Sequence, residues 1–237
     1  MAQLPSARRC LVGGAMLLLS ACSGTATTTP APSRTPTPAP TASATPLPPD
    51  TLSVGVLGLG VGTFDLAAFP VARLKNVAKF HAAAGVVVHF VTRRAGRTLG
   101  SLDSVAVNLA PGETLAVSGD CTDACNGATG VDATVMVGSW TTSIGPVFTT
   151  ASAAYTCQPC HPAHGFGNVK GTLTPSSAIS AGVAVVGFAV CENSAGVILG
   201  GGSEQFVWQA GATLSADVPV VLNAAPASCS LGASTGW

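Results

Sequence analysis

The stretch VVVHFVTRRAGRTLG, from Val86 to Gly100, alternates apolar residues and then reaches a glycine-containing turn. Val86, Val88 and Phe90 fall on one face of an extended chain, because successive side chains of a strand point to opposite faces. This period of two, rich in β-branched and aromatic residues, predicts a β-strand that ends in a hairpin. Beyond the first 50 residues no segment combines helical apolar spacing with capping residues, so the sequence predicts an all-β fold.

The pattern returns about 100 residues later, where Val186, Phe188 and Val190 alternate in the same way. Four sequence blocks match in the same order: AGRTLG (95–100) with AGVILG (195–200) at an offset of 100, LAPGETL (109–115) with WQAGATL (208–214) at 99, RLKNV (73–77) with NVKGT (168–172) at 95, and GSW ending at Trp140 with TGW ending at Trp237 at 97. Four matches in register predict two copies of one fold.

The strand spacing predicts that each copy is an antiparallel, immunoglobulin-like β-sandwich of about seven strands. The first module spans 51–140 and the second spans 166–237, with 148 as an alternative start of its first strand. Residues 141–165 are the predicted connector. The glycine-rich segment VGVLGLGVGTFD (54–65) is interpreted as the first strand, because no helix or suitably placed acid completes a dinucleotide-binding motif there.

The chain begins with an export signal: Arg8 and Arg9 precede an apolar run from Leu11 to Leu19, which is shorter than the roughly 20 residues that span a membrane. The run ends in Leu-Ser-Ala-Cys22, which resembles the lipobox of bacterial lipoproteins. This resemblance implies that residues 1–21 are removed, that Cys22 is lipidated, and that the protein is exported and lipid-anchored to the bacterial cell membrane, facing the outside of the cytoplasm. An ordinary secretory signal with an unrelated cysteine is the alternative.

Residues 22–50 contain eight prolines among Thr, Ser and Ala. Such a segment buries too little apolar surface to offset the entropy of ordering, so it is predicted to be a disordered, semi-extended stalk. The lipobox and the stalk together predict a folded body held away from a membrane.

Three short motifs of the first copy, VARLKN (71–76), AGRTLG and APGE (110–113), resemble the FxLYD-type and related immunoglobulin-like modules of bacterial surface lipoproteins. In the second copy FAVCE (188–192) is similar to a degenerate form of the FxLYD motif, whereas VHFVT (88–92) of the first copy departs from it. The resemblance implies a fold and a compartment, and it transfers no catalytic residues.

Composition narrows the function classes further. The net charge is zero and 8% of the residues are charged, which gives no support to nucleic-acid binding. The chain has no Gly-x-Ser-x-Gly motif and no close carboxylate pair that marks acid–base catalysis. The predicted function is therefore non-catalytic binding or structure, with a protein or a cell-envelope polymer as partner.

Removal of Cys10 and lipidation of Cys22 leave six cysteines in an oxidising compartment, and six cysteines allow 15 pairings. A local bridge between Cys121 and Cys125 is the simplest pairing in their polar loop. A second bridge between Cys191 and Cys229 would tie two strands of the second copy.

Cys157 and Cys160 lie in CQPCH, for which three chemistries remain open. Cys157, Cys160 and His161 have the spacing that attaches a covalent haem c, and Cys157, Cys160 and His164 could contribute to a metal site. A structural disulfide is favoured, because haem c domains usually surround the porphyrin with helices and this segment is a proline-broken connector. An exported haem c electron-transfer protein is the alternative function.

Two surfaces are candidates for contact with a partner. The first is the set of sheet edges and loops, including the loop from Cys121 to Gly130. The second is a basic run that could bind an anionic surface, although a solvated face is the commoner role of such a run. The run consists of Arg73, Lys75, Lys79, Arg93, Arg94 and Arg97.

Overall fold

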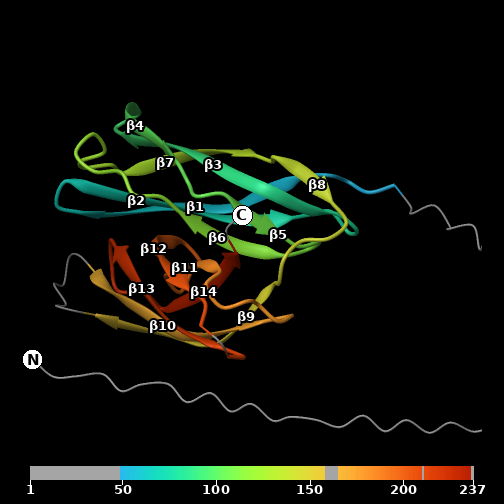
Figure 1. Ribbon diagram of the computed structural model, residues 1–237. Helices are drawn as coiled ribbons and strands as arrows, with labels where there is room; N and C mark the ends of the chain where they lie inside the picture. The colour runs from blue at the N-terminus through green and yellow to red at the C-terminus, as the bar shows by residue number, and fades with distance from the viewer. Residues whose placement is uncertain (1–48, 158–164, 210, 236–237) are drawn as a thin grey trace, which may run out of the picture. The chain divides into compact units, whose positions relative to one another are not determined.

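The computed structural model describes residues 49–157, 165–209 and 211–235 (Figure 1). These residues form antiparallel β-strands and contain no helix, in agreement with the predicted all-β class. The first half contains β1 (Val54–Phe64), β2 (Ala67–Asn76), β3 (Ala82–Arg94), β4 (Arg97–Asp103), β5 (Val107–Leu109), β6 (Thr114–Ser118), β7 (Gly130–Met136) and β8 (Ser139–Thr141). The second half contains β9 (Phe148–Cys157), β10 (Gly165–Pro175), β11 (Ala184–Glu192), β12 (Ile198–Val207), β13 (Leu214–Leu222) and β14 (Ser228–Thr235).

The first half is a sandwich of two sheets. One sheet has the order β1-β2-β6. In the other, β3 is central, with β4 and β5 along one edge and β7 and β8 along the opposite edge. This is the A-B-E and C-F order of the immunoglobulin sandwich, with the strand between C and E paired to C.

The second half has an equivalent strand arrangement, but there β12 also pairs with β13, so its six strands form one sheet in the order β14-β11-β12-β13-β10-β9. The order β9-β10-β13 corresponds to β1-β2-β6, and β12-β11-β14 corresponds to the sheet centred on β3. Each sandwich has six strands when β4 with β5, and β7 with β8, are counted as interrupted strands. Seven were expected, and the difference arises because no described strand pairs with the outer edge of β7 or β14.

The matched turns explain the duplicated AG motif. Gly96 follows β3 and Gly196 follows β11, with φ angles of 78° and 76° that side chains rarely adopt. One of the four sequence matches is wrong, however. Leu74 pairs with Leu115 and Leu173 pairs with Leu214, so β2 and β10 correspond at an offset of 99 rather than 95. The match of RLKNV with NVKGT is a chance likeness of common strand and turn residues.

Each sandwich has its own core. In the first, Val86, Val88 and Phe90 are fully buried, as their alternation predicted. The second is built around Trp208, which directly follows β12, together with Leu173 and other buried residues of β10, β11 and β13. Burial of this apolar surface is the main favourable term for folding.

Residues 47–237 form one compact unit, in which the sandwiches pack against each other. Central strand β11 is buried on both faces: Val185 and Ala189 belong to the second core, whereas Phe188 lies in the first. The predicted connector, 141–165, contains β9, which pairs with β10 and belongs to the second sandwich. The described part of the chain has no apolar helix of membrane-spanning length.

Strand β1 contacts the second sandwich through alternate glycines. A Cβ atom on Gly60 would lie 2.5 Å from Ile198 Cγ2, and a Cβ atom on Gly62 would lie 2.0 Å from the Val221 carbonyl oxygen. Only glycine allows this approach. The glycine-rich segment is thus a first strand, as predicted, and its glycines permit the packing of the two sandwiches.

Candidate binding groove between the sandwiches

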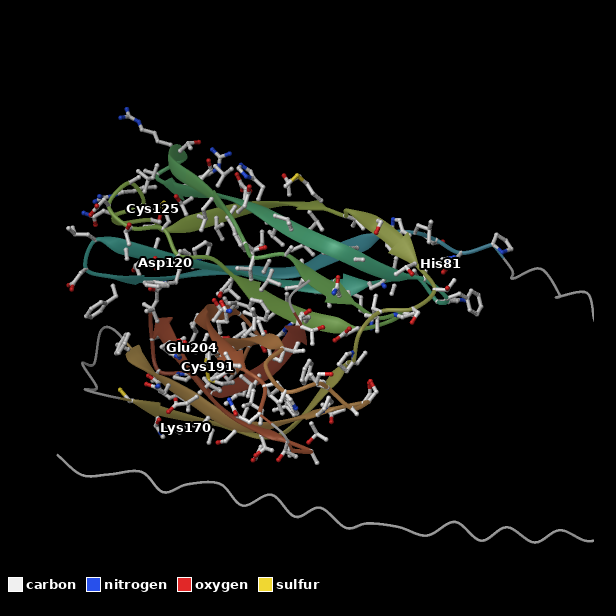
Figure 2. All side chains as sticks on the ribbon, viewed as in Figure 1. His81, Asp120, Cys125, Lys170, Cys191 and Glu204 are labelled. Atoms are coloured by element: carbon white, nitrogen blue, oxygen red, sulfur yellow. A yellow bond between two sulfur atoms is a disulfide. The ribbon has the colours of Figure 1, made fainter. Side chains whose placement is uncertain are left out.

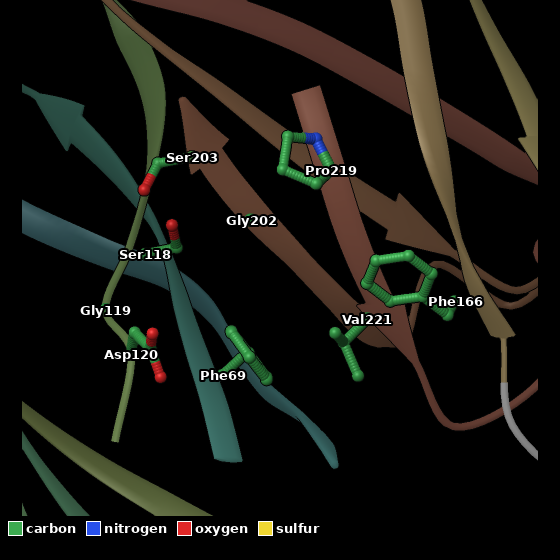
Figure 3. A pocket seen from close by; sticks show the side chains of 9 residues that line it. All are labelled: Phe69, Ser118, Gly119, Asp120, Phe166, Gly202, Ser203, Pro219 and Val221. Carbon is green, nitrogen blue, oxygen red and sulfur yellow. The ribbon is translucent and has the colours of Figure 1, made fainter. Parts of the chain in front are cut away.

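A groove of about 330 Å³ opens between the two sandwiches (Figure 3). We call it the Asp120 groove. Figure 3 shows Asp120 and Phe69 beside each other on one wall, with Val221 and Phe166 across from them. The lining residues are Phe69, Ser118, Gly119, Asp120, Phe166, Gly202, Ser203, Pro219 and Val221. This volume lies at the lower end of the range for small-ligand sites, and it suits a few side chains of a partner.

The first-sandwich wall is fixed by backbone pairing on both sides of Asp120. Gly119 N donates to Pro70 O at 3.0 Å, and Cys121 N donates to Ala68 O at 2.9 Å. Ala68 N in turn donates to Cys121 O at 2.8 Å. Because both neighbours of Asp120 are held against β2, its carboxylate is presented from a fixed backbone. A preorganised group loses less entropy when it binds.

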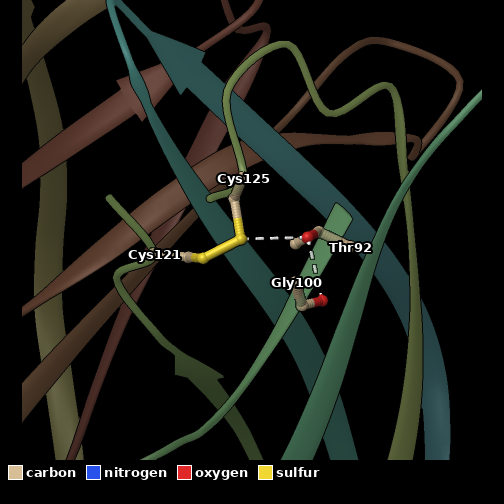
Figure 4. The surroundings of a disulfide bond; sticks show 4 residues. All are labelled: Thr92, Gly100, Cys121 and Cys125. Carbon is tan, nitrogen blue, oxygen red and sulfur yellow. Dashed lines mark hydrogen bonds between the residues drawn. A yellow bond between two sulfur atoms is a disulfide. The ribbon is translucent and has the colours of Figure 1, made fainter. Parts of the chain in front are cut away.

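A disulfide loop continues from this wall (Figure 4). Cys121 and Cys125 are bonded, with Cα atoms 5.7 Å apart, and Cys125 is fully buried. Thr92 Oγ1 lies 3.0 Å from Cys125 Sγ and donates to Gly100 O at 3.1 Å. The loop is therefore attached both to β2 and to the β3–β4 hairpin.

This loop is specific to the first copy. Residues 119–129 join β6 to β7, whereas residues 223–227 make the corresponding connection from β13 to β14. Long ordered loops on a rigid scaffold are frequent binding elements. The predicted contact loop, Cys121 to Gly130, begins directly after Gly119 and Asp120, which line the groove.

An exposed aromatic pair extends the apolar wall. The rings of Phe64 and Phe166 have centroids 5.8 Å apart, and these residues are 42% and 38% exposed. Because Phe166 lines the groove, this pair continues the apolar surface beyond it, and adjoining exposed apolar side chains indicate a contact surface more strongly than isolated ones do.

The second-sandwich wall lies where the β12–β13 ladder ends. The β12–β13 ladder consists of Gly200 with Leu222 and Gly201 with Val221. Beyond it, Gly202 and Ser203 line the groove opposite Pro219, which lacks the N–H needed to continue a ladder. From Ser203 onward, β12 pairs with β11 on one side, and no described strand pairs with its other side.

Asp120 is the one charged residue among those that line the groove. It takes part in none of the ion pairs formed by the described residues. The groove thus combines apolar and aromatic walls with a single carboxylate that forms no ion pair among the described residues. This combination favours a partner that carries a positive charge.

The structure pairs the cysteines largely as the sequence suggested. Cys121 is bonded to Cys125, and Cys191 is bonded to Cys229 across β11 and β14. Cys157, at the end of β9, is also disulfide-bonded. No group of three potential metal ligands occurs within the described ranges. Cys22, Cys160, His161 and His164 lie outside the described residues, so their predicted roles remain predictions.

The six residues of the predicted anionic-surface patch do not share one face. Arg73 and Lys75 lie on β2, where Arg73 Nη1 is 2.6 Å from Glu192 Oε1 of the second sandwich. Lys79 is exposed in the turn between β2 and β3. Arg73 therefore joins the two sandwiches instead of facing an external polyanion.

The other three cations gather at the β3–β4 hairpin. Arg93 pairs with Asp132 of β7, while Arg94 and Arg97 are exposed. This smaller cluster is the part of the basic run that the structure brings together.

Sequence reasoning singled out neither Phe69, Phe166 nor Asp120. Phe69 and Phe166 lie near the starts of β2 and β10, but at the offset of 99 Phe69 corresponds to Asn168, so the duplication does not mark the two rings as a pair. Asp120 immediately precedes the loop that only one copy has. Comparison with models of protein families finds no match, and neither does comparison with curated proteins.

Proposed function

We propose that the protein is a lipid-anchored bacterial surface protein that binds a partner without catalysis. Cys22 carries the lipid, the proline-rich segment acts as the stalk, and the tandem sandwiches are the binding body. The partner is a protein or a cell-envelope polymer. The observation that carries the binding role is the Asp120 groove, whose walls come from both sandwiches.

The disulfides support export. Cys121 with Cys125 and Cys191 with Cys229 are formed within the folded body, and such bonds persist in oxidising compartments. The packing supports a rigid scaffold, because β11 contributes to both cores and the glycines of β1 allow close contact. A rigid scaffold with a fixed loop loses little conformational entropy when it binds a partner.

The anchor is tested by expressing the full chain and its Cys22→Ser variant in a bacterial host. We expect the parent chain in the membrane fraction, with an intact mass that includes acyl chains and lacks residues 1–21. The Cys22→Ser variant should leave the membrane fraction and carry no acyl mass. Equal membrane retention of both chains without acyl mass would contradict lipid anchoring.

The binding role is tested with the same anchored chain. Phe166→Ala removes a partly exposed ring from the groove, whereas Phe80→Ala removes a ring that is 36% exposed in the turn between β2 and β3, away from the groove lining. If the groove is the binding site, Phe166→Ala should weaken retention of host cells on envelope polymers or on partner-coated surfaces, and Phe80→Ala should not. Equal retention by both variants would contradict the proposed role of the groove.

A further inference from the structure

The Asp120 groove offers two kinds of contact that an extended polypeptide uses. Its side-chain surface is aromatic and aliphatic, from Phe69, Phe166 and Val221, with one carboxylate at Asp120. The β12 edge continues from Ser203 at the groove, and from there onward no described strand pairs with it on the side away from β11. In strand addition, the open edge provides main-chain hydrogen bonds and a neighbouring pocket provides side-chain specificity.

We infer that the groove binds an extended polypeptide segment through a Lys or Arg side chain. This inference rests on the proposed binding function and names the chemistry of the partner. The segment pairs with the free part of β12, and its basic side chain lies across the rings of Phe69 and Phe166 to reach the carboxylate of Asp120.

The chemistry of the groove fits this side chain better than an apolar or acidic one. The methylene stem of Lys or Arg packs on an apolar surface while its charged end stays in a polar environment. An aromatic face attracts a cation. The carboxylate of Asp120 can accept a charged hydrogen bond, and none of the basic side chains among the described residues pairs with it. No lining residue carries a positive charge that would repel the incoming group.

The position of Asp120 supports selection by charge. Its neighbours Gly119 and Cys121 are bonded to β2, so the carboxylate does not need to be ordered on binding. Asp123, in the same loop, is exposed, has a φ of 51° and does not line the groove. Substitution of each by Asn removes one negative charge from the same loop, and Asn tolerates the left-handed conformation at position 123. Asp123→Asn is therefore the matched control for Asp120→Asn.

The test measures retention of the full chain, solubilised in detergent, on four pools of immobilised heptapeptides. The peptides are acetylated and amidated, their central residue is Lys, Arg, norleucine or Glu, and their other positions are randomised. We expect the Lys and Arg pools to retain the protein about tenfold more strongly than the norleucine pool at low salt. The difference should shrink as salt is raised, because the charge pair is solvent-accessible.

The variants distinguish recognition of the basic side chain from binding to the groove in general. Asp120→Asn should reduce retention on the Lys and Arg pools to the norleucine level, Asp123→Asn should leave it unchanged, and Phe166→Ala should weaken retention on every pool. Unfolding midpoints equal to that of the parent chain show that the variants are folded.

Two results would overturn the inference in different ways. If the norleucine pool retains the protein as strongly as the Lys pool does, and only Phe166→Ala weakens binding, the inferred requirement for a basic side chain is wrong. The groove then remains a binding site. If no pool is retained above the level of Phe166→Ala, both the inference and the proposed role of the groove are wrong.

Discussion

At the scale of single residues, Asp50 shows how one side chain fixes the start of the folded body. Its carboxylate accepts hydrogen bonds from the backbone N–H groups of Lys79 at 2.8 Å, Phe80 at 2.9 Å and His81 at 3.2 Å. His81 Nδ1 lies 3.0 Å from the same carboxylate, whose side chain is 3% exposed. Burial raises the pKa of Asp50, but these hydrogen bonds together hold it well below the usual range.

The lowered pKa of Asp50 gives a prediction about pH. Because the carboxylate is ionised more readily in the folded than in the unfolded chain, it stabilises the fold above the unfolded pKa of about 4. That stabilisation is lost as the pH falls through the folded pKa. Asp50→Asn should lower the unfolding midpoint at pH 7, and the difference from the parent chain should shrink below about pH 4. Chemical denaturation of both chains across this range checks the prediction, and a difference independent of pH would contradict it.

Gly62 gives a second prediction at this scale. A Cβ atom there would lie 2.0 Å from the Val221 carbonyl oxygen, so Gly62→Ala must push the sandwiches apart. Overpacking of this kind costs about 1–3 kcal/mol, and we expect that loss in the free energy of unfolding. Gly55→Ala is the control on the same strand, because nothing lies within 4 Å of its added methyl group. Equal stability of the two variants would contradict the contact.

The residue scale also shows what the sequence could reveal. The burial of Val86, Val88 and Phe90 follows from alternation alone, since one face of a half-covered strand must be apolar. The role of Gly60 and Gly62 could not be found in this way. Glycine at alternate positions has no hydrophobic signal, and only the approach of Ile198 and Val221 gives it meaning.

At the scale of elements, the Cys121–Cys125 and Cys191–Cys229 disulfides have different roles. Cys191 and Cys229 are directly paired residues of β11 and β14, separated by 38 positions in the chain. Cys121 and Cys125 are separated by 4 and close the loop beside the groove. In the chain-entropy model a bridge stabilises by restricting the unfolded chain, and it does so more when it closes a longer loop.

Removal of each bridge should therefore give a different result. Cys191→Ala with Cys229→Ala should cost about 4 kcal/mol of unfolding free energy, and Cys121→Ala with Cys125→Ala about 2 kcal/mol. The second pair should also weaken peptide binding at the groove, which the first pair should affect less. Denaturant unfolding and peptide retention measure both effects. Loss of stability without loss of binding in the second pair would contradict the role of the loop.

Elements also mark the limit of prediction from pattern. Turn glycines placed the β3–β4 and β11–β12 hairpins correctly, because Gly96 and Gly196 meet a backbone requirement that is local. The groove depends on contacts between strands that are distant in the chain. Phe69 and Phe166 come together with Asp120 only after both sandwiches have packed, and no local period encodes that.

At the scale of the whole molecule, the shared interior predicts cooperative unfolding. Phe188 of the second sandwich is fully buried in the core of the first, and Arg73 pairs with Glu192 across the junction. Phe188→Ala should cost about 3–5 kcal/mol, as large core truncations do. We expect a single calorimetric transition for residues 47–237 in the full chain, shifted as a whole in the variant. Two separate transitions, with only one shifted, would show that the sandwiches unfold independently.

We propose that the partner binds at the junction of the two sandwiches. Photo-crosslinking tests it most directly, with a benzophenone placed beside the central Lys of a heptapeptide selected on the parent chain. Mass spectrometry of the digested product should locate the crosslinks in the segments that contain Phe69, Asp120, Phe166 and Ser203, and Phe166→Ala should abolish them. Crosslinks confined to the β3–β4 hairpin, or unchanged by Phe166→Ala, would contradict the account.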